Sequence, residues 1–262
     1  MRKEPEHTNR TGVSRAPAGY GQYCPLALSA ELLCQRWTIL VLSRVIDGCH
    51  RFNEIRRGVP QISPTLLSQR LEQLEAAGLI RSTPLEGRRG RDYQLTNAGA
   101  DAEGLIVEMA GWGQRWARDM VSEDLDPAFL VWSMHTRLAT DRMPEGRTVL
   151  EFAFTGSPTD CDRFWLIHED GQVEMCLQDP GLSSDVLLES DLRRFVEAWR
   201  GFRDMKQEIQ AGHIRLYGER SHRLALPEWL LGSTLWRQPR MRKGAERRAY
   251  LRRRRTPAER DA

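Results

Sequence analysis

The chain has 262 residues, of which 40% are hydrophobic and 29% charged, and its net charge is +3 at pH 7. This composition is typical of a folded chain with one or two domains, and it is neither that of a disordered protein nor that of a membrane protein. No apolar run reaches the ~18 residues of a membrane span, and no apolar stretch follows the charged N-terminus, so we expect a cytoplasmic protein without a secretory signal or a membrane partner.

The side chains of this sequence do not form a pattern that indicates an enzyme. The five cysteines are odd in number, and no two have Cys-x-x-Cys spacing, which argues against a disulfide scaffold and a structural zinc site. The sequence also has no phosphate-binding glycine loop, nucleophile elbow or His-Glu-x-x-His motif. We therefore expect no catalytic residues, no metal and no cofactor.

Charge is distributed unevenly along the chain. Residues 121–236 contain 12 basic and 20 acidic side chains, whereas residues 237–262 contain 11 basic and 3 acidic ones. This asymmetry predicts at least two domains with different partners. Residues 237–262 and 1–19 have few large apolar side chains, so we expect a disordered basic tail at the C-terminus and a flexible tail at the N-terminus.

The order of elements in residues 20–122 predicts a winged helix-turn-helix domain. Apolar spacing and Pro25 indicate a first helix that begins near Cys24. Further helices are expected at Trp37–Val45, Phe52–Arg57 and Pro64–Ala77, then short strands at Leu79–Thr83 and Asp92–Leu95, and then a long helix capped by Thr96. Three helices followed by a two-stranded hairpin and a further helix are typical of this motif.

The helix Pro64–Ala77 is the predicted recognition helix. Leu67, Leu71 and Leu74 recur at i, i+4 and i+7 and define its inner face. Its outer and N-terminal residues carry hydroxyl and amide groups that can contact bases or phosphates. We predict DNA contacts from Ser63, Thr65, Ser68 and Gln69. The alternative is an ordinary solvated helix face.

Arginines near this helix favour DNA binding over that alternative. Residues 51–91 contain eight arginines and four acidic residues. Arg88, Arg89 and Arg91 crowd the expected hairpin turn, where they could lie along a phosphate backbone or enter the minor groove. Arg56 and Arg57 are further candidates for phosphate contacts, although cations are also favoured at a helix C-terminus for electrostatic reasons.

These motifs, in this order, resemble those of the HxlR-type winged helix-turn-helix regulators of bacteria. The similarity covers residues 24–120 and is carried by Cys24-Pro25, Arg36-Trp37, Arg51-Phe52-Asn53-Glu54-Ile55, Ile62-Ser63, Leu67, Leu71, Leu74-Glu75, Gly78-Leu79, Tyr93-Gln94-Leu95-Thr96 and Gly99. The family usually has Gly-Gly before the basic-Trp pair, where this chain has Cys34-Gln35. The resemblance implies a transcription regulator that binds double-stranded DNA as a homodimer.

Two further roles are implied by this resemblance. The family dimerises through its N-terminal helix and the long helix after the wing, and an apolar stripe on the long helix fits this role: Leu105, Met109, Trp112 and Trp116. The alternative is that the stripe packs against the second domain of the same chain. Some members use an N-terminal cysteine as a redox sensor, so Cys24 is a candidate sensor, the alternative being a small packing residue.

The second half of the chain predicts an α+β domain. After the acidic hinge Glu123–Pro127, we expect a helix at Phe129–Ala139. Strands at Thr148–Phe154, Asp162–His168 and Gln172–Leu177 precede helices at Asp191–Arg200 and Phe202–Ala211, a strand at His213–Tyr217, and a short helix at Pro227–Leu231. Strands followed by helices, with one late strand, are typical of the α+β class.

This half resembles the sterol carrier protein type 2-like domain. The similar features are Ser184-Asp185-Val186, the helix Asp191–Arg200 and the sequence from Gly212 to Gly218. The resemblance implies a five-stranded, lipid-binding α+β fold over residues 126–232. Candidate pocket residues for a hydrophobic small molecule are Trp132, Trp165, Met175, Phe195 and Trp199, although aromatic side chains at this spacing can also be ordinary core.

The sequence therefore predicts an α+β protein in which a DNA-binding winged helix precedes a domain that senses a hydrophobic ligand or supports assembly. The alternative is a carrier of lipids or other hydrophobic molecules whose winged helix contacts proteins. The arginines at the hairpin turn favour the first hypothesis, because a module that does not bind DNA gains nothing from concentrating cations there.

Overall fold

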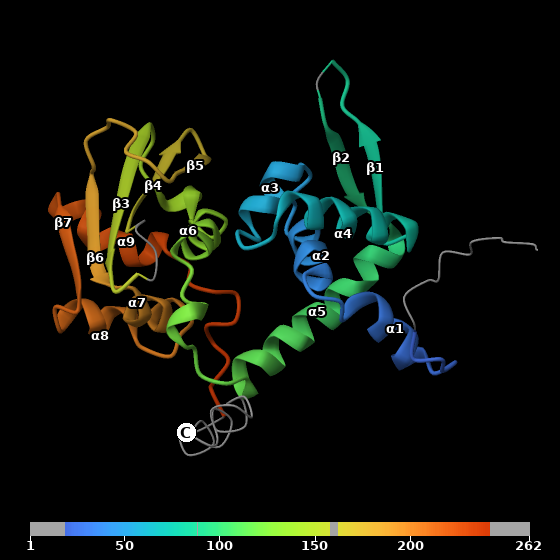
Figure 1. Cartoon of the computed structure of the whole chain (residues 1–262). Coiled ribbons are helices and arrows are strands. Elements are labelled where there is room, and N and C mark those ends of the chain that lie inside the picture. Colours follow the sequence, from blue (N-terminus) through green and yellow to red (C-terminus); the bar gives the residue numbers. More distant parts are fainter. Residues whose placement is uncertain (1–18, 88, 158–161, 242–262) are drawn as a thin grey trace, which may run out of the picture.

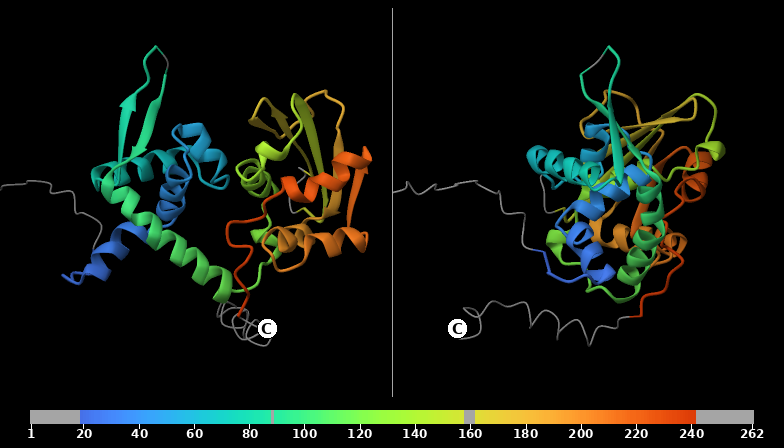
Figure 2. Two further views of the ribbon diagram at one scale, coloured as in Figure 1. Left: turned by 180° about the vertical axis from the view of Figure 1, so that it is seen from behind. Right: turned by 90° about the vertical axis from the view of Figure 1, so that its right-hand side faces the viewer.

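The computed structural model describes residues 19–87, 89–157 and 162–241. Two lobes lie side by side and are linked along one side by a long helix (Figure 1). Seen from behind, this helix again runs from the base of the hairpin towards the second lobe (Figure 2). The predicted flexible N-terminal tail lies outside the described residues, except for Gly19.

The first lobe is a winged helix-turn-helix, as the sequence predicted. Its elements are α1 (Pro25–Leu33), α2 (Thr38–Ile46), α3 (Phe52–Arg57), α4 (Pro64–Ala76), β1 (Ile80–Pro84), β2 (Arg91–Leu95) and α5 (Asn97–Trp116). The Ser63 hydroxyl accepts a hydrogen bond from the Leu66 amide at 3.3 Å, and the Thr96 hydroxyl accepts one from the Gly99 amide at 3.2 Å. These N-caps fix where α4 and α5 begin.

The core of this lobe forms around the inner face of α4. Leu67, Leu71 and Leu74 are buried, as their spacing predicted, and they pack with Leu42 and Ile55. The hairpin is also tied to the start of α3, because Tyr93 N donates to His50 O at 2.9 Å. The second strand of the wing is therefore anchored to the segment that precedes α3.

The helices α1 and α2 meet at a sharp bend. Trp37 caps α2 in the left-handed region, at φ 79°, an uncommon conformation for a residue other than glycine. No single helix in the described ranges is long and apolar enough to cross a membrane; α1 and α2 reach that length and composition only when counted together, across a bend of 83°.

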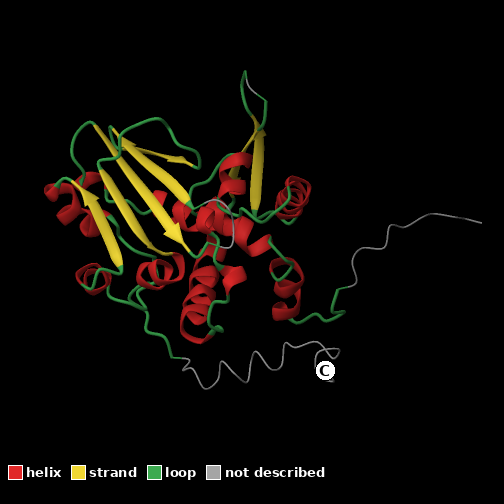
Figure 3. Ribbon diagram, turned by 60° about the vertical axis from the view of Figure 1, so that its left-hand side comes forward, coloured by secondary structure: helices red, strands yellow, loops and turns green. Residues whose placement is uncertain are grey.

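The second lobe is an α+β domain with a five-stranded sheet. Its elements are the 3₁₀ turn Ser122–Asp124, α6 (Pro127–His135), the 3₁₀ turn Thr140–Arg142, β3 (Arg147–Thr155), β4 (Arg163–Glu169), β5 (Gln172–Cys176), β6 (Val186–Asp191), α7 (Leu192–Trp199), α8 (Met205–Gln210), β7 (Ile214–Gly218) and α9 (Arg220–Trp229). The strand order is β5-β4-β3-β6-β7 (Figure 3), and only the β3–β6 pair is parallel.

The structure adds one strand and corrects two helix boundaries in this lobe. The sequence did not predict β6, because apolar and polar residues alternate only in part of this strand. The helix predicted at Pro227–Leu231 is α9, which begins earlier, at Arg220. Its first turn is polar, and its later residues Leu226 and Trp229 are buried. The helix predicted to reach Ala139 ends at His135, because the chain then bends to pair Leu138 with Leu230.

The interior between the sheet and helices α6, α7 and α9 is filled by the domain's own side chains. Phe152, Phe164 and Phe195 are entirely buried there. Trp165 lies on the opposite face of the sheet, where it packs with Val149. The five residues predicted to line one pocket are thus divided: Phe195 and Trp199 are buried in this core with Met175 packed against it, whereas Trp132 packs in the core of the first lobe and strand alternation places Trp165 on the other face of the sheet.

Residues 233–241, which we call the strap, run back from the end of α9 to the end of α5 (Figure 1). Arg240 forms an ion pair with Asp119 at 2.6 Å, and Arg115 donates to the Gln238 side chain at 2.9 Å. The prediction of a disordered tail from residue 237 is thus wrong for residues 237–241. Residues 242–262, with the remainder of that predicted tail, lie outside the described ranges.

Candidate nucleic-acid interface

The helices α3 and α4 and the hairpin share one side of the winged domain, whereas α1 and α5 lie on the other (Figure 1). On α4, Thr65 and Gln69 are exposed and Ser68 is partly buried. Ser63 is exposed, but its hydroxyl is used as the helix cap. The N-terminal turns of α4 thus present an amide and a hydroxyl outward, groups that can read base edges.

Arg70 on α4 was not singled out in the sequence, and it holds the helix-turn-helix together. Its guanidinium donates to Arg36 O at 2.9 Å, to Gln35 Oε1 at 3.2 Å and to Gln73 Oε1 at 2.6 Å. Gln35 is where this chain departs from the usual Gly-Gly pair, so its amide gives Arg70 a partner at that junction. The only feature of the sequence that could have indicated this role of Arg70 is its basic side chain next to Gln69.

The hairpin is braced against the C-terminal end of α4. Glu75 accepts hydrogen bonds from the Ser82 hydroxyl at 2.7 Å and from the Ser82 amide at 3.0 Å. Arg91 donates to the same hydroxyl at 2.6 Å and lies 3.8 Å from Glu75. The Ser82 hydroxyl, with a contribution from Arg91, lowers the pKa of Glu75. Arg91 therefore positions the wing in addition to carrying a charge.

The other predicted cations lie at the edges of this side. Arg89 is exposed in the hairpin turn, and Arg56 and Arg57 are exposed in the last turn of α3. Arg88 lies outside the described residues. These exposed guanidinium groups can neutralise phosphates on either side of a groove that α4 would enter.

The apolar stripe on α5 is open to solvent within one chain. Leu105, Met109, Trp112 and Trp116 are each between 41% and 59% exposed. On α1, Leu26 is 77% exposed. Leu105 and Met109 are not buried by their own chain, so packing against the second domain does not account for them, whereas Trp112 and Trp116 also line a space between the two domains.

The cysteines differ in their surroundings. Cys24 is the N-cap residue of α1 and is exposed, as is Cys34. Cys49 is buried, and this burial raises the pKa of its thiol to about 11. Cys24, Cys34, Cys49 and Cys176 are free thiols, and Cys161 lies outside the described residues.

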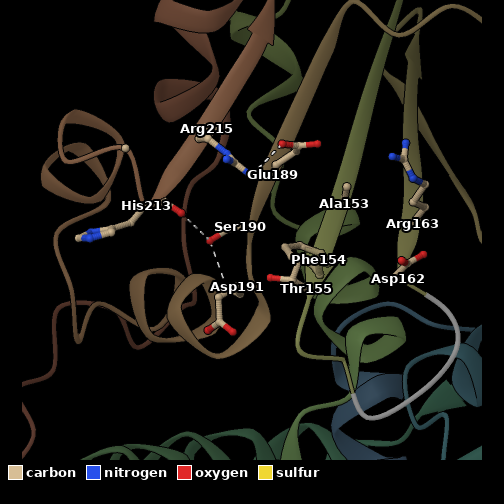
Figure 4. A pocket seen from close by; sticks show the side chains of 11 residues that line it. Ala153, Phe154, Thr155, Asp162, Arg163, Glu189, Ser190, Asp191, His213 and Arg215 are labelled. Atoms are coloured by element: carbon tan, nitrogen blue, oxygen red, sulfur yellow. Dashed lines mark hydrogen bonds and ion pairs between the residues drawn. The ribbon is translucent and has the colours of Figure 1, made fainter.

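A small polar pocket of about 220 Å³ lies on the second domain beside β6 and β7 (Figure 4). The arginines in its wall are paired within the domain: Arg215 pairs with Glu189 at 3.1 Å, and Arg163 pairs with Glu151. These pairings leave little charge to attract a ligand.

Known proteins match the winged part of the chain. The pattern described as the HxlR-like helix-turn-helix covers residues 32–121. The HTH-type transcriptional regulator YodB of Bacillus subtilis is 32% identical over 105 residues, which are 38% of this chain and 94% of YodB. The chain belongs to the HxlR-like helix-turn-helix family.

Two further comparisons match the same part of the chain. The uncharacterized regulator YvaP of Bacillus subtilis is 29% identical over 111 residues, which are 42% of this chain and 95% of YvaP. A solved structure of the reduced form of YodB is 34% identical, covers 36% of this chain and 93% of its own, and has a TM-score of 0.32. These HxlR-like relatives are transcriptional regulators and not enzymes, so double-stranded DNA is the partner expected for the winged domain.

Proposed function

We propose that this protein binds an operator in double-stranded DNA as a homodimer, with α4 in the major groove and the hairpin along the backbone. The observation that supports this proposal is the shared side of the winged domain. There, the exposed Thr65 and Gln69 lie with the exposed Arg56, Arg57 and Arg89. In such an arrangement the small polar groups contact base edges and determine sequence specificity. The guanidinium groups contact phosphates and position the protein on the DNA.

We assign direct base contacts to Thr65 and Gln69, and nearby contacts with bases or phosphates to Ser63 and Ser68. We assign backbone or minor-groove contacts to the wing arginines Arg88, Arg89 and Arg91, and phosphate contacts to the α3 arginines. Glutamine can pair bidentately with adenine, which makes Gln69 the main candidate for sequence specificity.

Replacing Gln69 by alanine tests the base-reading assignment. An operator is first identified by genomic footprinting with the purified protein. Gln69→Ala is then expected to cost ~1–3 kcal/mol of binding free energy at that operator and to relax the preference at one base position. Fluorescence anisotropy with single-base variants of the operator measures both effects.

The matched control is Gln73→Ala, one turn further along α4. Its amide oxygen already accepts a hydrogen bond from Arg70 at 2.6 Å, so we expect the base preference to stay unchanged. If Gln69→Ala leaves operator affinity and preference intact, a different face of α4 meets the DNA.

We further propose that the dimer forms through α5 and α1. The support is the exposed stripe on α5, a helix that lies with α1 on the side of the domain away from α4: Leu105, Met109, Trp112 and Trp116, of which Trp112 and Trp116 also line the space between the domains. Large apolar and aromatic side chains are typical anchors of a protein interface. This arrangement leaves both recognition helices free to enter successive major grooves.

The double variant Leu105→Glu, Met109→Glu is expected to be monomeric in light scattering. Two carboxylates without partners would be buried in the apolar interface, which is costly. Val107→Glu is the control, because at 100° per residue Val107 lies on the opposite side of α5, and it is also exposed. A dimer that persists in the double variant would exclude this interface.

For the second domain we propose a sterol-carrier-like fold that senses a hydrophobic ligand or supports assembly. The five-stranded α+β architecture agrees with the sterol-carrier-like part, and the filled space around Phe152, Phe164 and Phe195 points away from a lipid tunnel beneath the sheet. Cys24 stays a candidate redox sensor, because its thiol is exposed at a helix N-terminus on the side of the proposed dimer interface.

A further inference from the structure

A cavity of about 960 Å³ lies between the winged domain and the second domain. Its walls come from both domains: α2 and α5 on one side, α6 and α7 on the other, with the hinge before α6 and the strap completing it. This volume is at the upper end of the about 300–1,000 Å³ found for small-molecule sites. The cavity is separate from the filled interior beneath the sheet.

Aromatic rings dominate the apolar part of the cavity wall. Trp112 and Trp116 enter it from α5, Phe129 and Trp132 from α6, and Trp199 from α7. Phe129 and Trp132 are stacked, with ring centroids 6.1 Å apart and an interplanar angle of 17°. Trp112 and Phe129 remain 59% and 44% exposed, so a planar ligand could cover aromatic surface that the chain itself leaves in water.

Two arginines in the wall carry charge that their partners do not neutralise. Arg137 donates to Gly232 O at 3.2 Å, and Arg200 donates to the side-chain oxygen of Gln114 at 2.7 Å. In the described part of the chain these acceptors are neutral. Burial, reinforced by the nearby charge of Arg240, lowers the pKa of Arg200, as expected for a cation without an anionic partner.

The other two arginines of the cavity are matched by carboxylates. Arg44 pairs with Asp47 at 3.1 Å, and Arg118 pairs with Asp124. The unmatched pair belongs to the wall of one cavity, and the segments that carry it are linked: Arg137 Nε donates to Gly232 O, and the backbone amide of the next residue, Ser233, donates to Trp199 O at 2.9 Å, one residue before Arg200. An anionic group placed there would meet two guanidinium groups.

We propose that the cavity between the two domains binds a small aromatic anion. Its rings pack against Trp112, Trp116 and Phe129, and its carboxylate or sulfonate group lies on Arg137 and Arg200. The proposal deepens the sensing role proposed above and replaces a lipid tunnel by an interdomain site. Binding can be measured without DNA, so its failure is distinguishable from a failure of the proposed DNA-binding function.

Binding here is placed to affect the helix-turn-helix. Trp132 and Arg44 line the cavity, and the Arg44 guanidinium lies 4.4 Å from the centroid of the Trp132 ring. A Cβ on Gly58, the C-cap residue of α3, would lie only 2.8 Å from Trp132 Cζ2. A ligand that binds more tightly at one distance between α2 and α6 therefore changes the preferred position of α3.

The test uses the full chain and two fluorescent probes that differ in one charge. Anilinonaphthalene sulfonate supplies the aromatic anion, and N-phenylnaphthylamine supplies the same rings without the sulfonate. We expect saturable binding of the sulfonate at one site per chain, about tenfold tighter than the neutral probe. Arg137→Gln should weaken the sulfonate about tenfold and leave the neutral probe unchanged.

A second variant tests the location of the site. Ser133→Trp fills the cavity with an indole and should weaken both probes, with Thr136→Trp as the replacement if the first variant does not keep the wild-type melting temperature. The controls are Arg220→Gln and Leu224→Ala in a separate groove of about 410 Å³ beside β7 and α9, which also combines arginines with apolar side chains. These controls should bind both probes as the wild type does.

Several results would overturn the proposal. Equal affinity for the two probes would exclude an anion site, and sensitivity to Leu224→Ala but not to Ser133→Trp would place the probe in the other groove. Binding only by the monomeric Leu105→Glu, Met109→Glu variant would show that a second copy of the chain covers the cavity. Absence of sulfonate binding by the wild type would reject the aromatic anion as the ligand class.

Discussion

Trp132→Ala is expected to lower the free energy of unfolding by about 3–5 kcal/mol, the usual cost of removing a large buried aromatic side chain. Trp132 belongs to α6 of the second domain but is 5% exposed and packs in the core of the winged domain. Its ring is covered by the Arg44 guanidinium and stacked on Phe129. Chemical denaturation followed by circular dichroism measures the loss.

Hydrogen exchange separates the role of Trp132 in joining the domains from simple core packing. Trp132→Ala should increase amide exchange in α2 and α3 as well as in α6. Trp229→Ala is the matched control, because this indole is 3% exposed but packs only within the core of the second domain. Its loss should be similar in size and should leave α3 protected. Unchanged exchange in α3 of Trp132→Ala would mean that the domains are joined elsewhere.

The double variant Arg88→Ala, Arg89→Ala is expected to weaken DNA binding about 100-fold at ~0.1 M salt, with little dependence on sequence. Each lost phosphate contact reduces the slope of log K against log salt by about 0.9, so a dimer that loses four contacts loses about 3–4 units of slope. Fluorescence anisotropy at several salt concentrations gives both quantities. Arg91 is kept, because its bonds to Ser82 also hold the wing in place.

The control for the wing is Arg220→Ala, Arg223→Ala on α9. It removes the same net charge from exposed positions of the second domain, far along the chain from the helix-turn-helix. We expect its salt slope to match that of the wild type. If both double variants weaken binding equally, the total charge of the protein and not the hairpin determines its affinity for DNA.

Local sequence patterns were sufficient to predict the winged domain, because its helices are specified by residues close together in the sequence. Leu67, Leu71 and Leu74 recur on one helical face, and the signals Ser63-Pro64 and Thr96 lie at helix starts that the structure confirms. Capping and apolar periodicity act within a few residues, so they can be read from the sequence directly. The exposed face of α4 follows from the same periodicity.

In the second domain, local patterns were less informative. Of the strands, β6 was missed because its burial depends on β3 and β7 lying on either side of it. The proposed pocket residues were selected as large apolar side chains, but strand alternation places Trp165 on the other face from Phe152 and Phe164. Residue type alone does not say which face of a sheet a side chain meets.

By itself, the sequence determined the family and the helices and hairpin of the winged domain, because these depend on the spacing of residues within short segments. Only the tertiary structure decided that Trp132 packs in the other domain, that residues 237–241 form a strap, and that a cavity with two unmatched arginines separates the domains. The physical reason is that each of these features joins residues from distant segments. Their contact energy depends on how two separately folded cores meet, which no local pattern of side chains specifies.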